Sequence, residues 1–404
     1  MKKINIKKWS KDKNIKYIFN LLKSDNEETR FIGGCLRNLI LKKSVDDIDL
    51  ATTLTPKEVL KRLVKNKIKV VKSGISHGTI IAIVNKKKIE ITTLREDIKT
   101  DGRHAKVKFT KDWIIDSNRR DFTINALSCN LNGDLFDYHD GLKDLKEGNI
   151  KFIGDAEKRI KEDFLRILRF FRFYSLYGKK KIDSSYIEVF KKTSSKIKKL
   201  SSERISSEFK KILVSNNSYE VLNLMKTTNV LNNIIFDNSN LKKLKNLKLI
   251  PSLNKEFDFS TLLAIIIKEK SLLKIFKKLN LSNIEKQKIK NIIFYQKRIN
   301  FKEIESNIYK FIFIHGKDLC IALLLYDLIK YPIKNKIKKY INLVNLIKNT
   351  RIPKFPLAGK DVIKLGLKTG PSIGKILKFV EEWWLKNKTQ PKRKDCLKKL
   401  KEFS

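Results

Sequence analysis

The sequence is poor in cysteine, in long apolar runs and, relative to its basic residues, in acidic ones. Its four cysteines, Cys35, Cys129, Cys320 and Cys396, stand far apart and form no Cys-x-x-Cys pair. Isolated thiols of this kind favour neither a disulfide framework nor a zinc knuckle. We therefore expect a protein of a reducing, cytoplasmic compartment.

No apolar run approaches the roughly 20 residues with which a helix crosses a bilayer. Cys320–Tyr326 is one of the longest runs, and the basic N-terminal segment lacks the apolar core of a signal peptide. The sequence therefore predicts a protein without membrane contact.

Acidic residues are greatly outnumbered by basic ones. The 404 residues include 90 Lys and Arg against 43 Asp and Glu, a formal net charge of +47. This balance favours a polyanionic partner, and nucleic acid is the first candidate. A second interpretation stays open, because Lys, Ile and Asn are abundant throughout and compositional drift would also raise the charge. The length allows two or more domains, and a hydrophobic content of 41% fits a globular protein.

A glycine turn and a pair of aspartates lie close together near the N-terminus. Gly33 and Gly34 lead into a helical pattern, and a helix N-terminus after such a turn can cradle a phosphate. In the strand predicted for residues 47–50, Asp47 and Asp49 lie on one face. Carboxylate oxygens at this spacing suit Mg²⁺. The alternative is a turn followed by a solvent-exposed Asp-x-Asp pair.

Three further strands are predicted, over residues 68–71, 78–84 and 88–93. If the last of them lies beside the aspartate strand, Glu90 becomes a third carboxylate on the same face. Two Asp and one Glu around one or two Mg²⁺ ions is a layout for phosphoryl or nucleotidyl transfer. The alternative for Glu90 is an ordinary solvent-facing strand residue.

Helix and turn signals make the first part of the chain a mixed α/β domain. Helices are predicted over residues 14–23 and from the N-cap Thr55 to about Asn66. The pair Asn132-Gly133 predicts a tight hairpin between two short strands.

Residues 95–112 are polar and charged, and we expect a long mobile loop there, of the kind that is often functional. They are followed by Arg119, Arg120 and Asp121, which together can bind phosphate and ribose hydroxyls. A surface salt bridge before a strand is the alternative.

After residue 155 the pattern becomes helical. The helix predicted over residues 162–176 carries Asp163, Arg166, Arg169 and Arg172 at every third position. Arginine offers paired donors and aspartate paired acceptors, which match the hydrogen-bonding edge of a nucleotide base. The alternative is a set of i,i+3 salt bridges on a solvated helix.

The later helices contain no candidate catalytic cluster. They are predicted over residues 202–215, 219–232, 260–281, 282–299 and 305–330. More Pro and Gly after residue 350 indicate a small final domain. The basic excess is larger after residue 150, so nucleic acid would run along the helices and be held mainly by phosphate contacts.

In their order along the chain, these motifs resemble class II CCA-adding enzymes (tRNA nucleotidyltransferases). These belong to the tRNA nucleotidyltransferase/poly(A) polymerase family of the polymerase β superfamily. The matching segments are GGCLRN, DDIDLAT, KIEITTLR, DGRHAKV, RRDFTINAL, GDAEKRIKEDFLRILRFFRF, GPSIGKIL and FVEEWW. The resemblance is dense over the first 180 residues and looser over the last 50. Each segment alone is weak, but the ordered set is specific.

The resemblance implies an α+β fold. An N-terminal polymerase-β-like nucleotidyltransferase head with a small mixed sheet would be followed by an all-α neck, body and tail. The implied boundaries are 1–147 for the catalytic head, 148–215 for the neck with a nucleotide-templating helix, 216–300 for the body and 301–404 for a tail that binds tRNA.

The resemblance also implies roles for individual residues. Asp47 and Asp49 match the family's metal ligands, with Glu90 as the companion carboxylate. The segment 95–112 matches the flexible loop needed to switch from C to A. The triphosphate-binding turn is matched by Gly33, Gly34 and Arg37, and the ribose-binding segment by Arg120, Asp121 and Asn125. The E-D-x-x-R motif is matched by Glu162, Asp163 and Arg166. Arg169 and Arg172 continue the nucleotide-facing helix.

The implied activity is Mg²⁺-dependent addition of C and A to the 3′ end of tRNA, from CTP and ATP, without a nucleic-acid template and with release of pyrophosphate. The tRNA acceptor arm is the implied partner. The nearest alternatives are bacterial poly(A) polymerase and an A-only or CC-only tRNA-tailing enzyme. An inactive RNA-binding protein of the same fold is an alternative of another class.

One position departs from the family's pattern. The family usually has Asp after the arginine of the glycine turn, whereas this chain has Asn38 after Arg37. Asparagine keeps hydrogen bonding but loses the charge, so the effect on triphosphate affinity is open.

Overall fold

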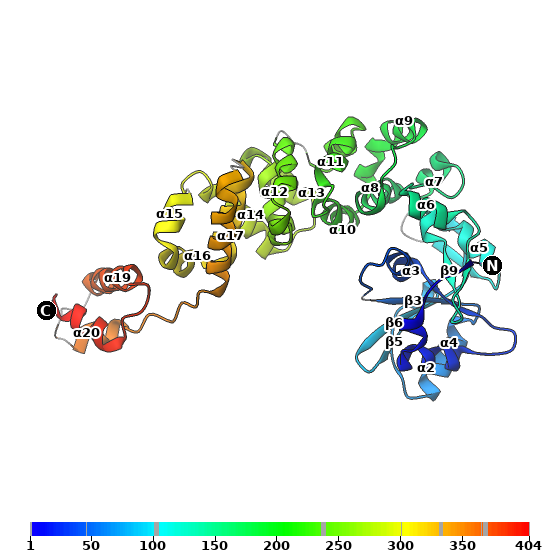
Figure 1. Ribbon diagram of the computed structural model, residues 1–404, viewed down its shortest axis with the longest axis horizontal. Coiled ribbons are helices and arrows are strands. Elements are labelled where there is room, and N and C mark those ends of the chain that lie inside the picture. Colours follow the sequence, from blue (N-terminus) through cyan, green and yellow to red (C-terminus); the bar gives the residue numbers. More distant parts are fainter. Residues whose placement is uncertain are drawn as a thin grey trace. The chain divides into compact units, whose positions relative to one another are not determined.

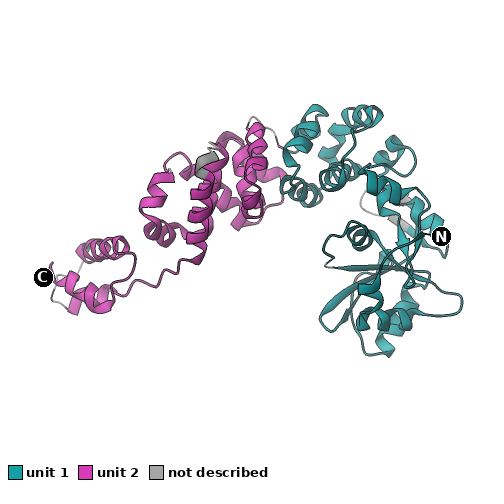
Figure 2. Cartoon of the chain, in the orientation of Figure 1, with its two compact units in different colours: residues 1–234 teal, residues 235–404 magenta. Residues whose placement is uncertain are grey.

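The computed structural model describes residues 2–45, 47–100, 105–235, 240–299, 301–330, 334–364, 366 and 371–403. The chain forms two compact units, residues 1–234 and 235–404 (Figure 2). We describe each unit by itself. The division predicted at residues 147, 215 and 300 is a finer one, and it stays a prediction.

The first unit contains an eight-stranded mixed sheet in the order β1-β10-β9-β2-β3-β6-β5-β4. Strands β3, β5, β6 and β9 are labelled in Figure 1. Strands β3 and β6 pair in parallel, and the other described pairs are antiparallel. This confirms the predicted α+β class with a small mixed sheet. The strands are β1 Lys2–Lys3, β2 Thr29–Ile32, β3 Ile48–Thr52, β4 Lys69–Gly74, β5 Thr79–Val84, β6 Lys87–Thr93, β9 Ser128–Cys129 and β10 Asp134–Phe136.

Strands β4, β5 and β6 lie where the alternation of β-branched residues predicts them. The aspartate strand β3 differs in its start, because its ladder to β6 begins at the pair Ile48 and Ile89. Asp47 therefore precedes the strand instead of lying within it. The hairpin predicted at Asn132-Gly133 is confirmed, since β9 and β10 pair in antiparallel fashion across it.

The prediction of an unstructured loop over residues 95–112 is wrong for most of that segment. Strands β7 (Arg95–Thr100) and β8 (Ala105–Phe109) form a separate two-stranded antiparallel sheet. The hairpin gave little strand signal in the sequence, because its strands are rich in Asp, Glu, Lys and Arg, and acidic residues and lysine are uncommon in strands. The segment 101–104, to which the expectation of mobility also applied, lies outside the described residues.

The helices of the sheet region confirm the predicted cap and first helix. α4 begins after Thr55 with a complete capping box, in which Thr55 and Glu58 each bond the other's backbone N–H. α4 packs against β4 and β5 and also contacts α2 (Figure 1). The helices are α1 Lys7–Ser10, α2 Lys13–Leu22, α3 Gly33–Ile40, α4 Pro56–Lys65, α5 Trp113–Asn118 and α6 Gly141–Glu147.

The remainder of the first unit is helical. Its helices are α7 Ala156–Glu162, α8 Leu165–Tyr177, α9 Ser184–Thr193, α10 Ser202–Leu213 and α11 Ser218–Thr227. The prediction of one continuous helix over residues 162–176 is wrong, because the chain is extended at Asp163 (φ −155°, ψ 107°). The Asp163 carboxylate accepts a hydrogen bond from the N–H of Leu165 at 3.0 Å, so it caps the next helix.

The second unit is all-helical in the part that the structure describes. Its α-helices are α12 Phe259–Ile266, α13 Leu272–Lys278, α14 Asn283–Tyr295, α15 Phe301–Ser306, α16 Ile308–Lys330, α17 Lys334–Asn349, α18 Gly359–Lys364, α19 Pro371–Lys386 and α20 Arg393–Lys401. The helix predicted over residues 260–281 is broken between α12 and α13 by a short 3₁₀ turn at Glu269–Ser271. α16 is kinked at Gly316, whose φ of 77° is not helical.

The last 50 residues contain an apolar cluster around Trp384, Val380 and Leu400, against which Phe313 of α16 also packs. The small final domain stays a prediction. A search of the described helices finds none with the length and hydropathy needed to span a bilayer.

Candidate active site

Two of the three predicted carboxylates lie side by side. Asp49 on β3 is paired in register with Glu90 on the parallel strand β6, so their side chains project from the same face. Burial and the charge of Asp47 raise the pKa of Asp49, and Arg37 offsets part of this rise. Partial desolvation and the charges of Asp49 and Asp47 raise the pKa of Glu90. All three carboxylates are therefore close enough to repel one another.

The predicted three-ligand metal cage is not formed. Within the described residues, no group of three His, Cys, Asp or Glu side chains is arranged to hold a metal ion. Asp47 is exposed and precedes β3, and repulsion from two neighbouring carboxylates favours its turning towards solvent. Asp49 and Glu90 therefore form an adjacent pair, and the assignment of Asp47 and Asp49 as metal ligands stays a prediction.

The glycine turn lies against this pair. Gly33 has a φ of 69°, a left-handed conformation that glycine adopts most easily. A Cβ added at Gly33 would lie 3.3 Å from Asp49 Oδ2, so a side chain would crowd the carboxylate. The N–H of Gly34 donates to Asp49. The turn therefore brings the N-terminus of α3, with its positive dipole, next to the carboxylates.

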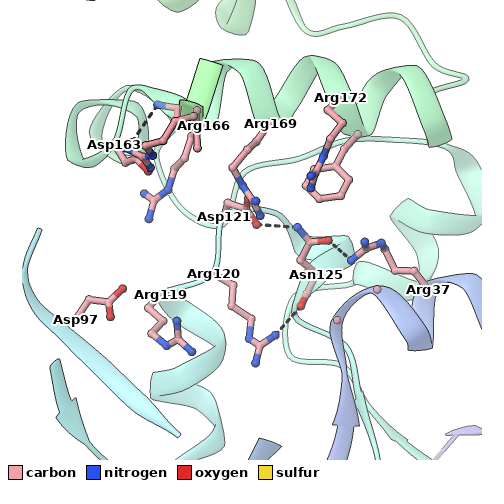
Figure 3. Close-up of a pocket in the computed structure, with 15 residues that line it drawn as sticks. Arg37, Asp97, Arg119, Arg120, Asp121, Asn125, Asp163, Arg166, Arg169 and Arg172 are labelled. Carbon is pink, nitrogen blue, oxygen red and sulfur yellow. Dashed lines mark hydrogen bonds and ion pairs between the residues drawn. The ribbon is translucent and has the colours of Figure 1, made fainter. Parts of the chain in front are cut away.

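A pocket of about 430 Å³ opens beside the turn, wholly within the first unit (Figure 3). Arginines outnumber aspartates in its lining, which favours an anionic ligand. The predicted nucleotide-binding residues that line it are Gly33, Gly34, Arg37, Arg120, Asp121, Asn125, Asp163, Arg166, Arg169 and Arg172. Arg119, which the sequence grouped with Arg120 and Asp121, also lines the pocket. The lining residues that the sequence did not single out as nucleotide-binding are Asp97, Leu165, Phe173 and Arg204.

A chain of hydrogen bonds crosses the pocket floor from α3 to α8. Arg37 donates to the side-chain oxygen of Asn125, and the Asn125 amide donates to Asp121 Oδ1 at 2.7 Å. Arg169 Nε donates to the other Asp121 oxygen at 2.5 Å. Burial alone would raise the pKa of Asp121, but the Arg169 charge and these hydrogen bonds outweigh it and lower the pKa to about 2. Asp121 is therefore a carboxylate that stays ionised and is held between Asn125 and Arg169.

Asp116 orients the two adjacent arginines, and the sequence interpretation missed it. Its Oδ1 accepts from Arg119 at 2.7 Å and its Oδ2 accepts from Arg120 at 2.8 Å. Burial would raise the pKa of Asp116, but Arg120 and Arg119 lower it overall. The spacings of three and four residues between Asp116 on α5 and the two arginines just after that helix could have suggested this pairing.

Glu162 does not line this pocket; its role in the structure is to orient arginines. Its Oε2 accepts from Arg159 at 2.7 Å and from Arg166 at 2.5 Å. Arg159 was not among the predicted site residues. A basic residue three positions before a glutamate on a helix is a common surface pattern, so it gave no distinct signal.

Two partners from α10 also escaped the sequence interpretation. Arg204 pairs with Asp163 at 2.7 Å, and Glu208 pairs with Arg172 at 3.1 Å. They lie 41 and 36 positions from their partners, a separation at which no local periodicity operates. The predicted base-facing residues Asp163 and Arg172 are thus both held by α10.

Asn38, the departure from the family's pattern, is held by two hydrogen bonds. Its side-chain amide donates to the carbonyl oxygen of Ser44 at 3.1 Å, and its side-chain oxygen accepts from the hydroxyl of Tyr177 at 3.2 Å. The guanidinium of Arg37 lies 5.5 Å from the Tyr177 ring centroid. Asn38 therefore links α3 to α8 and to the segment that leads into Asp47.

Two family models match the chain. Residues 29–151 match the Poly A polymerase head domain, and residues 181–237 match the probable RNA and SrmB-binding site of polymerase A. The first match contains the carboxylates and the glycine turn, and the second contains α9 to α11.

Curated relatives match over most of the chain. The chain is 33% identical over 401 residues to the human mitochondrial CCA tRNA nucleotidyltransferase 1, covering 96% of this chain and 90% of that protein. It is 30% identical to the Lactococcus lactis CCA-adding enzyme over 391 residues, covering 93% of this chain and 94% of that protein.

Solved structures show the same fold. The CCA-adding enzyme of Bacillus stearothermophilus in complex with CTP superimposes with a TM-score of 0.77 at 22% identity, covering 96% of each chain. The Thermotoga maritima CCA-adding enzyme complexed with tRNA gives a TM-score of 0.66 at 21% identity, covering 100% of each chain.

Proposed function

The chain belongs to the family of CCA-adding enzymes, the CCA tRNA nucleotidyltransferases, and we propose that it completes the 3′ end of tRNA with C and A from CTP and ATP. The observation that carries this assignment is the pocket in which the glycine turn, the fixed Asp121, Asp163 and the arginines of α8 meet. The Asp49–Glu90 pair lies against the same glycine turn. Poly(A) tailing, A-only or CC-only addition and inactive RNA binding are not favoured, since the relatives described above are CCA-adding enzymes.

We assign the triphosphate to the glycine turn. Gly33 and Gly34 bring the positive end of α3 to the pocket, and Arg37 adds a full charge. The Nε of Arg37 is buried and has no hydrogen-bond acceptor among the described residues, so an anion there would relieve an unpaired donor. This supports a phosphate position next to α3.

We assign the ribose to Arg120, Asp121 and Asn125. The carbonyl oxygen of Asn125 accepts from Arg120 at 3.1 Å, and its side-chain amide is fixed by Asp121. A rigid carboxylate and amide can distinguish a ribose hydroxyl from hydrogen, because a deoxyribose would leave their buried hydrogen-bonding groups unpaired.

We assign base recognition to Asp163 and Arg166, with Glu162 orienting Arg166 and with Arg169 and Arg172 continuing the helix. In this proposal the protein itself serves as template, and the paired donors of Arg166 and the acceptors of Asp163 read the edge of C or A. The ion pairs of Asp163 with Arg204 and of Arg172 with Glu208 hold these groups before a nucleotide arrives.

Mg²⁺ is the cofactor that we propose, held by Asp47 and Asp49 with Glu90 close by. The donors are all carboxylate oxygens. Burial first, and then the charges of the neighbouring carboxylates, raise the pKa of Asp49 and of Glu90, and a bound cation would offset both effects. When bound, the ion would supply charge neutralisation for the triphosphate and for the attacking 3′ hydroxyl of tRNA. Gly33, Gly34 and Arg37 would hold the triphosphate beside the carboxylates, and the 3′ hydroxyl would attack the α-phosphate with release of pyrophosphate.

The tRNA would be bound mainly by the helical part of the chain. The match of residues 181–237 to an RNA-binding model supports this, as does the net charge of +47. Phosphate and shape contacts would dominate, as for other double-stranded RNA. The division into head, neck, body and tail at residues 147, 215 and 300 belongs to the same proposal.

The test uses purified protein, tRNA that lacks its 3′ CCA, Mg²⁺, and CTP and ATP offered separately and together. Growth by three nucleotides only when both are present supports the proposal. Unlimited growth with ATP alone would show a poly(A) polymerase. Growth that stops after C although both nucleotides are present would show a CC-only enzyme, and addition of A only to tRNA that already ends in CC would show an A-only enzyme. The double variant D47A/D49A should bind tRNA and incorporate nothing; incorporation at the unmutated rate would remove the carboxylates from the mechanism.

A further inference from the structure

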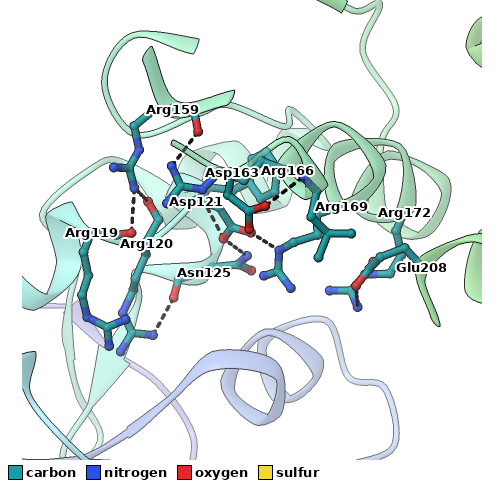
Figure 4. Close-up of polar contacts among 12 residues, drawn as sticks. Arg119, Arg120, Asp121, Asn125, Arg159, Asp163, Arg166, Arg169, Arg172 and Glu208 are labelled. Carbon is teal, nitrogen blue, oxygen red and sulfur yellow. Dashed lines mark hydrogen bonds and ion pairs between the residues drawn. The ribbon is translucent and has the colours of Figure 1, made fainter. Parts of the chain in front are cut away.

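Arg159, on α7, connects two parts of the pocket. Its Nη2 donates to the carbonyl oxygen of Arg119 at 2.6 Å and to that of Arg120 at 2.7 Å (Figure 4). Its Nη1 donates to Glu162 Oε2 at 2.7 Å. One guanidinium thus holds the two peptide units directly before Asp121 and, at the same time, the carboxylate that orients Arg166.

The connection closes into a ring of hydrogen bonds. Arg166 donates to the same Glu162 oxygen at 2.5 Å and also to the backbone carbonyl oxygen of Arg159 at 2.8 Å. Arg159 therefore acts through its side chain on one side and through its backbone on the other. Bonds that share donors and acceptors in this way restrict one another, so a shift at either end is transmitted to the other.

This arrangement has an electrostatic cost, which indicates that it is more than a surface ion pair. Only 13% of the Arg159 side chain is exposed, and burial together with the Arg166 charge lowers the pKa of Arg159. Glu162 offsets this cost because its carboxylate is shared by both arginines. An arginine is required for such a link, since a lysine ammonium has no planar fork with which to span two carbonyls and a carboxylate.

We infer that Arg159 is a positioning residue that fixes the distance between Asp121 and Arg166, and thereby sets nucleotide affinity and selectivity. The inference rests on the proposed function, in which Asp121 contacts the ribose and Arg166 the base of one nucleotide. A nucleotide is rigid between these two parts, so a pocket whose two halves drift relative to each other binds it less tightly. Such a pocket also rejects the wrong base less well, because misplacement by a fraction of an ångström weakens directional hydrogen bonds.

The test compares R159K with R62K. Arg62, on α4, is a matched control because its Nη1 likewise donates to two backbone carbonyls, those of Leu21 at 3.2 Å and Lys23 at 2.9 Å, outside the pocket. For R159K we expect the KM for CTP and for ATP to rise roughly tenfold, kcat to change less, and incorporation of UTP relative to CTP to increase. R62K should lower only the melting temperature.

A purely structural role for Arg159 predicts a different result. In that case R159K would lose stability as R62K does, with the KM values and the choice between CTP and UTP unchanged, and the inference would be overturned. If R159K does not give folded protein, R159Q, which keeps one neutral donor, is subjected to the same measurements. Failure of the unmutated protein to extend tRNA would instead overturn the proposed function, whatever the variants do.

Discussion

At the scale of single residues, the ionised Asp121 in the pocket makes the free energy of unfolding depend on pH in the acid range. Its pKa is about 2 in the folded protein against an ordinary value of 3.8, because Arg169 and hydrogen bonds favour the carboxylate. A lowered pKa means that the stabilisation is complete above the ordinary value and is lost as the pH falls towards 2. The shift corresponds to roughly 2 kcal/mol.

We therefore expect D121N to destabilise the protein clearly at pH 6 and progressively less between about pH 4 and 2. Urea unfolding of both proteins over this range measures the difference in the free energy of unfolding. A difference that stays constant down to pH 2 would mean that Asp121 is not held as a carboxylate by Arg169.

Asn38 offers a second prediction at this scale. N38D keeps an acceptor for the Tyr177 hydroxyl but removes the donor to the Ser44 carbonyl, and it leaves a carboxylate close to that oxygen. Because Ser44 lies on the segment that leads to Asp47, we expect kcat/KM for CTP to fall several-fold, in line with about 1 kcal/mol for one hydrogen bond.

The control is N66D, which removes an equivalent amide-to-carbonyl bond, to Arg62, outside the pocket. It should leave kcat/KM unchanged. If N38D is as active as the unmutated protein, or more active, then the amide of Asn38 has no role that the family's usual aspartate cannot fill.

At the scale of helices and strands, local signals were accurate where one residue dictates the geometry. The capping box at Thr55 and the hairpin at Asn132-Gly133 are as predicted. The alternation predicted which face of its strand Glu90 occupies, but its pairing with the aspartate strand was only a condition, which the structure meets for Asp49. By contrast, the break at Asp163 was missed, because helical periodicity continues across it and the cap is visible only from the hydrogen bond to Leu165.

The site could be predicted only in part for the same reason. The residues of the glycine turn and of the arginine-rich segments could be named from their motifs. Their orienting partners on α10, Arg204 and Glu208, could not, since ion pairs between helices depend on how the helices pack. The exposed position of Asp47 is likewise set by where the β3 ladder begins.

Two capping boxes, one in each unit, allow a test of the elements themselves. Thr55 caps α4 in the first unit, and Ser282 caps α14 in the second in the same way. Each of T55A and S282A should cost about 1 kcal/mol. In a calorimetric scan, T55A should lower the transition of the unit that contains the pocket and S282A that of the other.

Incorporation of CTP at a temperature below both transitions should be unaffected by either substitution. Equal shifts of a single transition in both variants would show that the two units unfold together. A loss of activity in T55A at low temperature would mean that the start of α4 contributes to the site.

At the scale of the whole molecule, the charge of +47 predicts how tRNA binding depends on salt. Each phosphate neutralised releases counterions, so the affinity should fall by roughly three orders of magnitude between 50 and 200 mM salt if six or more phosphates are contacted. Filter binding of tRNA at several KCl concentrations gives the slope.

The control is the affinity for CTP in the absence of tRNA, which should depend much less on salt because the ligand is small. A tRNA affinity that hardly changes with salt would show that the basic surface is a compositional trait and not the binding face. The sequence alone left open whether the charge marks nucleic-acid binding or compositional drift.

The parallel pairing of β3 with β6 has a kinetic consequence. Parallel neighbours cannot be joined by a tight turn, so the chain must complete α4, β4 and β5 before Asp49 and Glu90 can meet. Closing the segment between β3 and β6 costs chain entropy, and this cost is offset only after the two strands have paired. During refolding from denaturant, helical signal should thus return well before catalytic competence, and a newly synthesised chain stays inert until its crossover is finished.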